Sequence, residues 1–162
     1  MRMRILAALA FYFLYWGVCV LGTGTDKKNL LGLRSYPDAV QKQVRARLDA
    51  PEEKPLCAIL LSNLLLFTAV FSVLGLAMKR VLGLNGYWAA FRYFLALGEG
   101  LGLFDLVVID LLWWRNTARI RFSFLPEKRD YQDPRRHIDS FLRGIPLFAV
   151  IAALSAAIVC LL

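Results

Sequence analysis

The feature that most constrains this chain is an apolar run from Leu56 to Met78, which spans 23 residues without a charged side chain. A helix needs roughly 20 mostly apolar residues to cross a bilayer. Three further apolar stretches lie at residues 5–22, 87–114 and 144–162, in a chain of 162 residues that is 59% hydrophobic. The pattern predicts an all-α polytopic membrane protein, with four transmembrane helices in a single membrane domain, residues 1–162.

The first apolar stretch begins like a secretory signal, because Arg2 and Arg4 precede it. No small-x-small cleavage site follows it, and a signal would not carry so many large rings in its middle. The rings belong to Phe11, Tyr12, Phe13, Tyr15 and Trp16. We therefore interpret residues 5–22 as the first transmembrane helix.

The third stretch is unusual because it carries ionisable side chains. Tyr87-Trp88 and Trp113-Trp114 mark its two ends, as aromatic residues do at the two interfaces of a bilayer. Between them lie Arg92, Glu99, Asp105 and Asp110. Each ionised group near the bilayer centre costs about 2.5–3.5 kcal/mol on insertion scales, so these residues predict a function or a polar neighbour.

An α-helical wheel places three of these side chains on one face. At ~100° per residue, Arg92, Glu99 and Asp110 fall within about 20° of one another, and Asp105 points roughly 120–140° away. We predict an ion or substrate pathway there: Glu99 binds a proton or cation, Arg92 is its counter-charge or a substrate anchor, and Asp110 is a relay. Asp105 and Asn63 are the other candidate residues of this pathway. Glu99 or Asp105 could instead form hydrogen bonds between helices, for example to Ser62, Asn63 or Thr68.

The first long polar loop, residues 23–55, contains a candidate amphipathic helix. Ser35 is a candidate N-cap, and Pro37 suits the first helical turn. Val40, Val44 and Leu48 then recur every four residues. This spacing predicts a short helix lying on the membrane surface, the alternative being a solvated helix within the loop.

The second long loop, residues 115–143, alternates apolar and polar side chains between Arg119 and Phe124, which predicts a short extended piece. Asp133-Pro134 then predicts the start of a second short interfacial helix, with Ile138, Phe141 and Leu142 on its apolar face. This helix can continue into the last span, where Pro146 removes one backbone donor.

A second candidate site includes the only histidine, His137. With Asp110 and Asp139 it could form an acid–base or metal site at the cytoplasmic face. A solvated or headgroup-contacting histidine is the favoured interpretation, because one histidine without ligand spacing defines no metal centre. Three arginines, Arg135, Arg136 and Arg143, are candidates to contact lipid phosphates.

Small residues predict how the last two spans pack. Gly98 and Gly102 lie four apart on the third span, and alanines repeat at the same interval on the fourth span. Such faces allow two helix backbones to approach closely within lipid. The alanines are Ala149, Ala153 and Ala157, with a second row at Ala152 and Ala156.

The distribution of Lys and Arg predicts the orientation. The two long loops hold fifteen of these residues, and the N-terminus and the turn at residues 79–86 hold four. The positive-inside bias therefore places both long loops in the cytoplasm and both termini outside the cell membrane. The net charge of +8 comes from residues that border apolar segments, so we expect lipid headgroups and not nucleic acid as their partners.

The segment from Phe104 to Gly144 resembles a group of uncharacterised small four-helix bacterial membrane proteins. The resemblance rests on an Asp-x4-Asp-x2-Trp pattern, formed by Asp105, Asp110 and Trp113, with His137 further along. It implies that Asp105, Asp110 and His137 are the polar members of the pattern, and it implies no activity.

Three hypotheses about function follow from these residues. The first is transport of, or coupling to, a small ion or solute, in a homo-oligomer or with a partner membrane subunit. The second is a non-catalytic membrane subunit of a larger complex. The third is a membrane-embedded enzyme acting on an anionic lipid. No nucleotide-binding loop, zinc-protease motif or nucleophile elbow points to a cofactor or to a known catalytic class.

Overall fold

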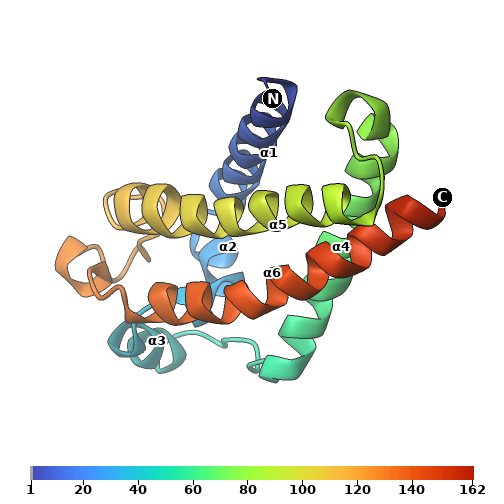
Figure 1. Cartoon of the computed structure of the whole chain (residues 1–162). Coiled ribbons are helices and arrows are strands. Elements are labelled where there is room, and N and C mark those ends of the chain that lie inside the picture. Colours follow the sequence, from blue (N-terminus) through green and yellow to red (C-terminus); the bar gives the residue numbers. More distant parts are fainter. Residues whose placement is uncertain (1) are drawn as a thin grey trace. The chain divides into compact units, whose positions relative to one another are not determined.

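The computed structural model describes residues 2–162, and within that range the chain is all-helical, as predicted (Figure 1). Six α-helices are joined by two short 3-10 turns and one π-helix, which directly follows α5. The elements are α1 (Arg2–Leu21), α2 (Asp26–Leu31), η1 (Leu33–Ser35), α3 (Asp38–Arg45), α4 (Leu56–Leu82), α5 (Tyr87–Phe104), the π-helix η2 (Asp105–Trp114), η3 (Lys128–Tyr131) and α6 (Arg135–Leu161).

Three helical stretches are long and apolar enough to cross a membrane: Arg2–Leu21, Leu56–Leu82 and Lys128–Leu161. They include three of the four predicted spans. The fourth, residues 87–114, divides into α5, which carries Arg92 and Glu99, and the ten-residue π-helix. Its crossing of the membrane therefore stays a prediction.

The chain divides into two compact units. Unit 1 contains Met1–Phe11, Lys54–Leu103 and Leu142–Leu162, and unit 2 contains Tyr12–Glu53 and Phe104–Phe141. Helices α1, α5 and α6 contribute residues to both units. A single membrane domain, residues 1–162, therefore stays a prediction.

Unit 1 packs around Phe71 of α4. Its ring stacks on Phe94 of α5 at 5.7 Å between centroids and lies parallel to Phe148 of α6 at 6.4 Å. Glycines bring the backbones together: a Cβ added at Gly98 would lie 2.7 Å from the Phe148 ring. The predicted close packing of the third and fourth apolar segments is therefore confirmed at Gly98.

Gly75 makes a second close approach, which the sequence did not reveal. A Cβ added there would lie 2.6 Å from Phe94 Cζ and 2.7 Å from Val159 Cγ2. We expect Gly75→Ala to destabilise the protein by about 1–2 kcal/mol, because overpacking outweighs the gain in helix propensity. Melting of the purified protein in detergent measures this loss.

The matched control is Gly17→Ala, since Gly17 is also helical but has nothing within 4 Å of the added Cβ. Its helix propensity alone should leave stability unchanged or slightly raised. Equal melting temperatures for the two variants would contradict the assigned packing at Gly75.

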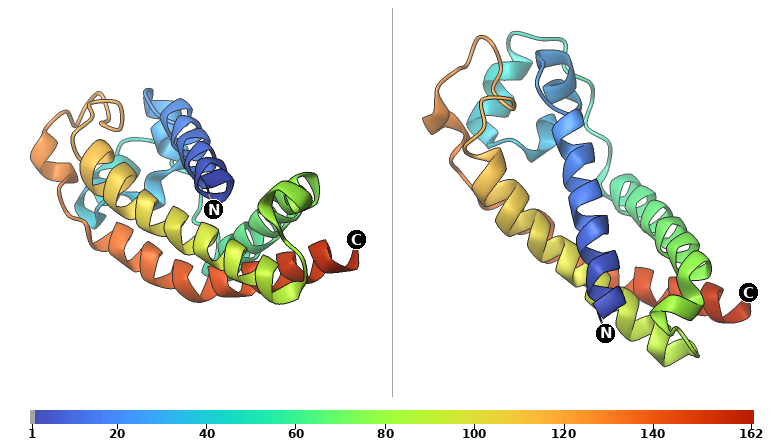
Figure 2. Two further views of the ribbon diagram at one scale, coloured as in Figure 1. Left: turned by 45° about the horizontal axis from the view of Figure 1, so that its top comes forward. Right: turned by 90° about the horizontal axis from the view of Figure 1, so that it is seen from above.

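The turn between α4 and α5 is tight, as predicted (Figure 2). Helix α4 extends past Met78 to Leu82, and Gly83 then ends it with φ +61°. The Leu84 N–H donates to Lys79 O at 3.0 Å, which satisfies one of the last helical carbonyls. Gly86, with φ +93°, supplies the second left-handed position before α5 begins.

In unit 2 the two long polar loops fold against each other, as both views of Figure 2 show. Val40 and Val44 of α3 are fully buried there, at 0% exposure. The predicted packing of this apolar face on a membrane surface is therefore wrong, because the face is buried against the other loop. The core consists of Leu33, Tyr36, Val40, Val44, Trp114, Ile120, Phe122, Leu125 and Tyr131.

Hydrogen bonds between distant residues hold these loops together. The Tyr36 hydroxyl donates to Ile120 O at 2.8 Å, and the buried Asn29 amide donates to Arg119 O at 3.0 Å. Asp26 accepts from both the N–H and the hydroxyl of Ser123.

The predicted extended piece at residues 119–124 is wrong in its backbone conformation. The segment consists of turns, with one isolated bridge between Phe122 and Leu125. The alternation in the sequence has a structural cause nevertheless, since Ile120 and Phe122 are buried in the core and Arg119 is exposed.

Helix α6 begins close to the predicted position. The Asp133 carboxylate accepts from the Arg135 N–H at 3.1 Å, and the helix then runs without interruption through Pro146 to Leu161. The predicted continuation of the loop helix into the last apolar segment is confirmed. Ile138 and Leu142 stay exposed on its surface.

Candidate functional site: an acidic cavity

Unit 2 contains a cavity of about 370 Å³ with a mixed polar and apolar wall. Helix α1, the first long loop, the π-helix and the first turns of α6 all contribute to it. The lining residues are Tyr15, Cys19, Gly22, Thr23, Lys28, Asn29, Gly32, Ser35, Tyr36, Asp105, Ile109, Asp110, Trp113, Trp114, Arg136, His137 and Ser140. Asp105, Asp110 and His137 are all among these lining residues.

The π-helix is what places Asp105 and Asp110 on the same wall. An α-helix would separate residues five apart by about 140°. In η2 the backbone bonds join residues five apart, as between the Arg115 N–H and Asp110 O at 3.3 Å. Both carboxylates therefore line the cavity, close enough to interact electrostatically.

The α-helical wheel is consequently wrong for Asp110, because it separates this residue from Asp105. The α-helical period on which it was drawn ends at Phe104, so the calculation does not extend to Asp110. π-Helical turns are rare and often occur at functional sites, so this segment is a candidate functional site.

His137 lies against Asp110. Its Nδ1 is 3.0 Å from Asp110 Oδ2, and the histidine side chain is only 4% exposed. The prediction of a solvated or headgroup-contacting histidine is therefore wrong, because the ring lies inside unit 2. Within residues 2–162 the buried Nε2 of His137 has no hydrogen-bond partner.

Trp114 packs against the imidazole, and Tyr36 packs against Trp114. The His137 ring meets Trp114 edge-on at 4.7 Å, and Trp114 in turn meets Tyr36 at 4.9 Å. Burial, with smaller contributions from Tyr131 and Asp26, raises the pKa of Tyr36 far above its ordinary value. The phenol is therefore a neutral donor. The stability it contributes is complete below the ordinary pKa of tyrosine and is lost as the pH rises from there through the raised pKa.

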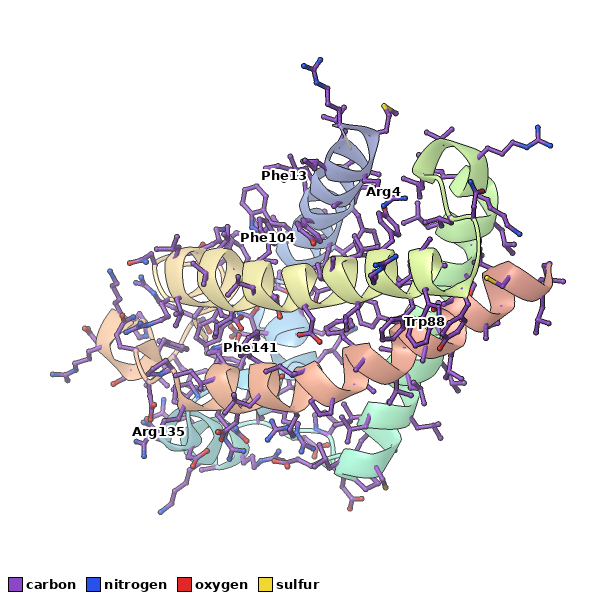
Figure 3. All side chains as sticks on the ribbon, in the orientation of Figure 1. Arg4, Phe13, Trp88, Phe104, Arg135 and Phe141 are labelled. Carbon is purple, nitrogen blue, oxygen red and sulfur yellow. The ribbon has the colours of Figure 1, made fainter. Side chains whose placement is uncertain are left out.

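The second half of α1 packs on the π-helix beside these acids. The rings of Tyr12 and Phe13 contact Phe104 at 5.5 and 6.1 Å, and Trp16 contacts Trp113 at 6.4 Å. Phe13 and Phe104 are labelled in Figure 3. These contacts position Tyr15 and Cys19, which occur on the same helix and line the cavity.

Two cations also line the cavity, and both already have partners. Arg136 donates to the Asp38 carboxylate, with Nε at 2.7 Å from Oδ1. Lys28 donates to Leu21 O at 2.8 Å. Arg135, the other predicted headgroup contact at this end of α6, pairs with Asp133 at 2.7 Å.

The remaining predicted site residues lie elsewhere. Asp139 is exposed on α6 and does not line the acidic cavity. Arg92 and Glu99 of α5, Asn63 of α4 and Arg143 of α6 belong to unit 1. The structure thus brings Asp105, Asp110 and His137 together, with Arg136 at the same cavity.

In unit 1, Glu99 is partly exposed, and within residues 2–162 it makes no hydrogen bond or ion pair. Arg92 is exposed and uses its Nε to donate to Trp88 O at 3.2 Å. Asn63 is half-buried, and its neighbour Ser62 bonds within its own helix, to Ala58 O. The alternative of interhelical bonds from Glu99 to these residues is not observed.

Four further cavity residues were not predicted from the sequence: Tyr15, Cys19, Asn29 and Tyr36. Nothing in the local pattern distinguishes Asn29 from a solvated loop asparagine, although it is almost completely buried. Among residues 2–162, no cluster of three or more His, Cys, Asp or Glu side chains is arranged to hold a metal ion.

Comparison with known proteins identifies no relative, so the function is inferred from the geometry of the cavity. No protein-family model, curated protein or solved structure matches the chain.

Proposed function

We propose that this chain is an integral membrane protein that carries a proton at the acidic cavity, as part of the transport of a small ion or solute. The observation that supports this most directly is the pairing of Asp105 and Asp110 on one wall, with His137 3.0 Å from Asp110. Carboxyl and imidazole groups exchange protons readily, and histidine does so near physiological pH.

The electrostatics of the cavity support a positively charged ligand. Two ionised carboxylates on the wall of one small cavity repel each other, and a bound proton or small cation relieves that repulsion. Arg136 is already paired with Asp38, so it does not neutralise the charges of both Asp105 and Asp110. A site that repeatedly gains and loses one positive charge fits this arrangement.

In the proposed topology, α5 and the π-helix together form the third of four spans. The fifteen Lys and Arg residues of the two long loops place those loops in the cytoplasm and both termini outside. Trp113 and Trp114 then lie near the cytoplasmic interface, and the acidic cavity opens at that depth.

Glu99 supports a partner within the membrane. A carboxylate near the middle of a span and without an internal partner requires a polar neighbour. A second copy of this chain, or another membrane subunit, supplies that neighbour in the proposed assembly. If the partner carries the activity, the chain is a non-catalytic subunit of the complex.

The His137–Asp110 pair also favours a second candidate function. A histidine oriented by a carboxylate is the usual general base of hydrolytic enzymes, and Arg136 and Lys28 could attract an anionic lipid. Turnover of an anionic phospholipid that is lost in His137→Ala would favour this enzyme. Full turnover by that variant would exclude His137 from the chemistry.

Proton flux tests the main proposal. We expect liposomes containing the full chain to take up protons under an imposed membrane potential, followed by a trapped pH dye. Asp105→Asn should lower the rate by about tenfold, because an amide cannot carry the proton.

Asp139→Asn is the matched control, since Asp139 is an exposed acid two residues from His137 and does not line the cavity. It should leave the rate unchanged. An Asp105→Asn variant that inserts normally and conducts like the unmodified protein would contradict the proposed role of the acidic cavity.

A further inference from the structure

A second cavity, entirely within unit 1, has a different character. Its volume is about 520 Å³, within the range of ligand sites. Two arginines and no acid line it, and most of the remaining wall is aliphatic. The lining shares no residue with the acidic cavity of unit 2.

The two cations come from segments far apart in the sequence. Arg4 projects from α1, and Trp88 lies near the start of α5 (Figure 3). Arg92 follows Trp88 by four residues on the same helix. Arg4 is anchored by two hydrogen bonds, from Nε to Leu82 O at 2.6 Å and from Nη2 to Gly83 O at 3.0 Å. A guanidinium has five N–H groups, so both side chains retain donors for a ligand.

The hydrogen bonds of Arg4 indicate at which end of the helices the cavity lies. It ties the start of α1 to the end of α4, and Arg92 lies near the start of α5, directly after the α4–α5 turn. Trp88 is 67% exposed, and Trp and Tyr side chains mark the level of lipid headgroups. In the proposed topology, the two guanidinium groups therefore lie at the level at which lipid phosphates occur.

The rest of the wall is suited to hydrocarbon. Ile5 and Ala8 of α1 face Ala89, Ala96 and Leu97 of α5 across the cavity. A free phosphate ion would use the two arginines but would leave this aliphatic surface uncovered. An anionic lipid uses both, because its phosphate meets the arginines and an acyl chain covers the alanines.

We infer that this cavity is a binding site for an anionic phospholipid, with its phosphate held between Arg4 and Arg92. Guanidinium groups bind phosphate with charge-assisted, often bidentate, hydrogen bonds. The inference rests on the proposed membrane topology, but it does not depend on the acidic cavity or on transport.

Lipid titration of the full chain in detergent, read by native mass spectrometry, tests this site. The probes are phosphatidylglycerol, phosphatidylcholine and glycerol 3-phosphate. We expect phosphatidylglycerol to bind about tenfold more tightly than phosphatidylcholine, and Arg92→Ala to remove that preference. Glycerol 3-phosphate should not compete, because it lacks the acyl chain.

Two further variants make the result specific. Ala96→Phe fills the aliphatic part without changing charge, and it should also weaken phosphatidylglycerol binding. Arg80→Ala removes an exposed arginine of α4 that does not line the cavity, and it should bind normally. Arg4→Ala is informative only if it folds, since Arg4 also braces the end of α4.

Several outcomes would overturn the inference. Equal losses in Arg80→Ala and Arg92→Ala would indicate general attraction to basic surface. Binding of glycerol 3-phosphate as tight as that of the lipid would mean that the aliphatic wall plays no part. A dimer that persists without lipid and dissociates in Ala96→Phe would assign the cavity to a second copy of the chain.

Discussion

His137→Ala is expected to destabilise unit 2 by about 3 kcal/mol, because it leaves a mostly buried Asp110 carboxylate without the imidazole nitrogen 3.0 Å away. It also removes the edge contact with the Trp114 ring. For a chain of this size the melting temperature should fall by about 6–12 °C. Thermal melting of the purified protein in detergent measures the change.

A double-mutant cycle with Asp110→Asn isolates the pair. If the two side chains depend on each other, the double variant should lose clearly less than the sum of the two single losses. Asp139→Asn, on the exposed side of the same helix, should have almost no effect. Strictly additive losses would mean that the 3.0 Å contact contributes nothing to folding.

Phe122→Ala is expected to destabilise the core between the two long loops more than His137→Ala does, by about 4 kcal/mol of unfolding free energy. Phe122 is only 1% exposed, and it belongs to the core that Tyr36 and Val44 share with the second loop. Removing the ring leaves a cavity that the surrounding side chains cannot easily fill. The two loops should then open together and become accessible to protease.

Limited trypsin digestion measures this opening, because the two loops contain fifteen Lys and Arg residues. Phe124→Ala is the matched control, since that ring lies two residues away and is only partly buried. It should accelerate cleavage much less. Similar cleavage rates for the two variants would argue against a shared core between the loops.

Much of the fold follows from local patterns. The uncharged run at Leu56–Met78 predicts helix α4, and Asp133-Pro134 predicts the beginning of α6 within two residues. Gly83 and Gly86 predict the turn before α5, because each takes a left-handed conformation that other residues rarely adopt. These signals depend on a few neighbouring residues, so a single sequence is sufficient to read them.

The candidate site was only partly predictable. Asp105, Asp110 and His137 were each recognised, but the helical wheel separated the two acids and the favoured interpretation left His137 exposed. The wheel assumed ~100° per residue, whereas the backbone from Asp105 to Trp114 bonds residues five apart. A change of helical period has no signature in hydropathy, so only coordinates reveal it.

The sequence by itself determined which segments are apolar helices and where their charges occur, because hydropathy and helix capping are properties of short segments. Tertiary structure alone decided what those segments face. The apolar side of α3 meets the second loop, through bonds such as Tyr36 to Ile120 across 84 residues, and not a lipid surface. An apolar face is buried equally well by lipid or by protein, and the choice depends on contacts between segments that no local pattern encodes.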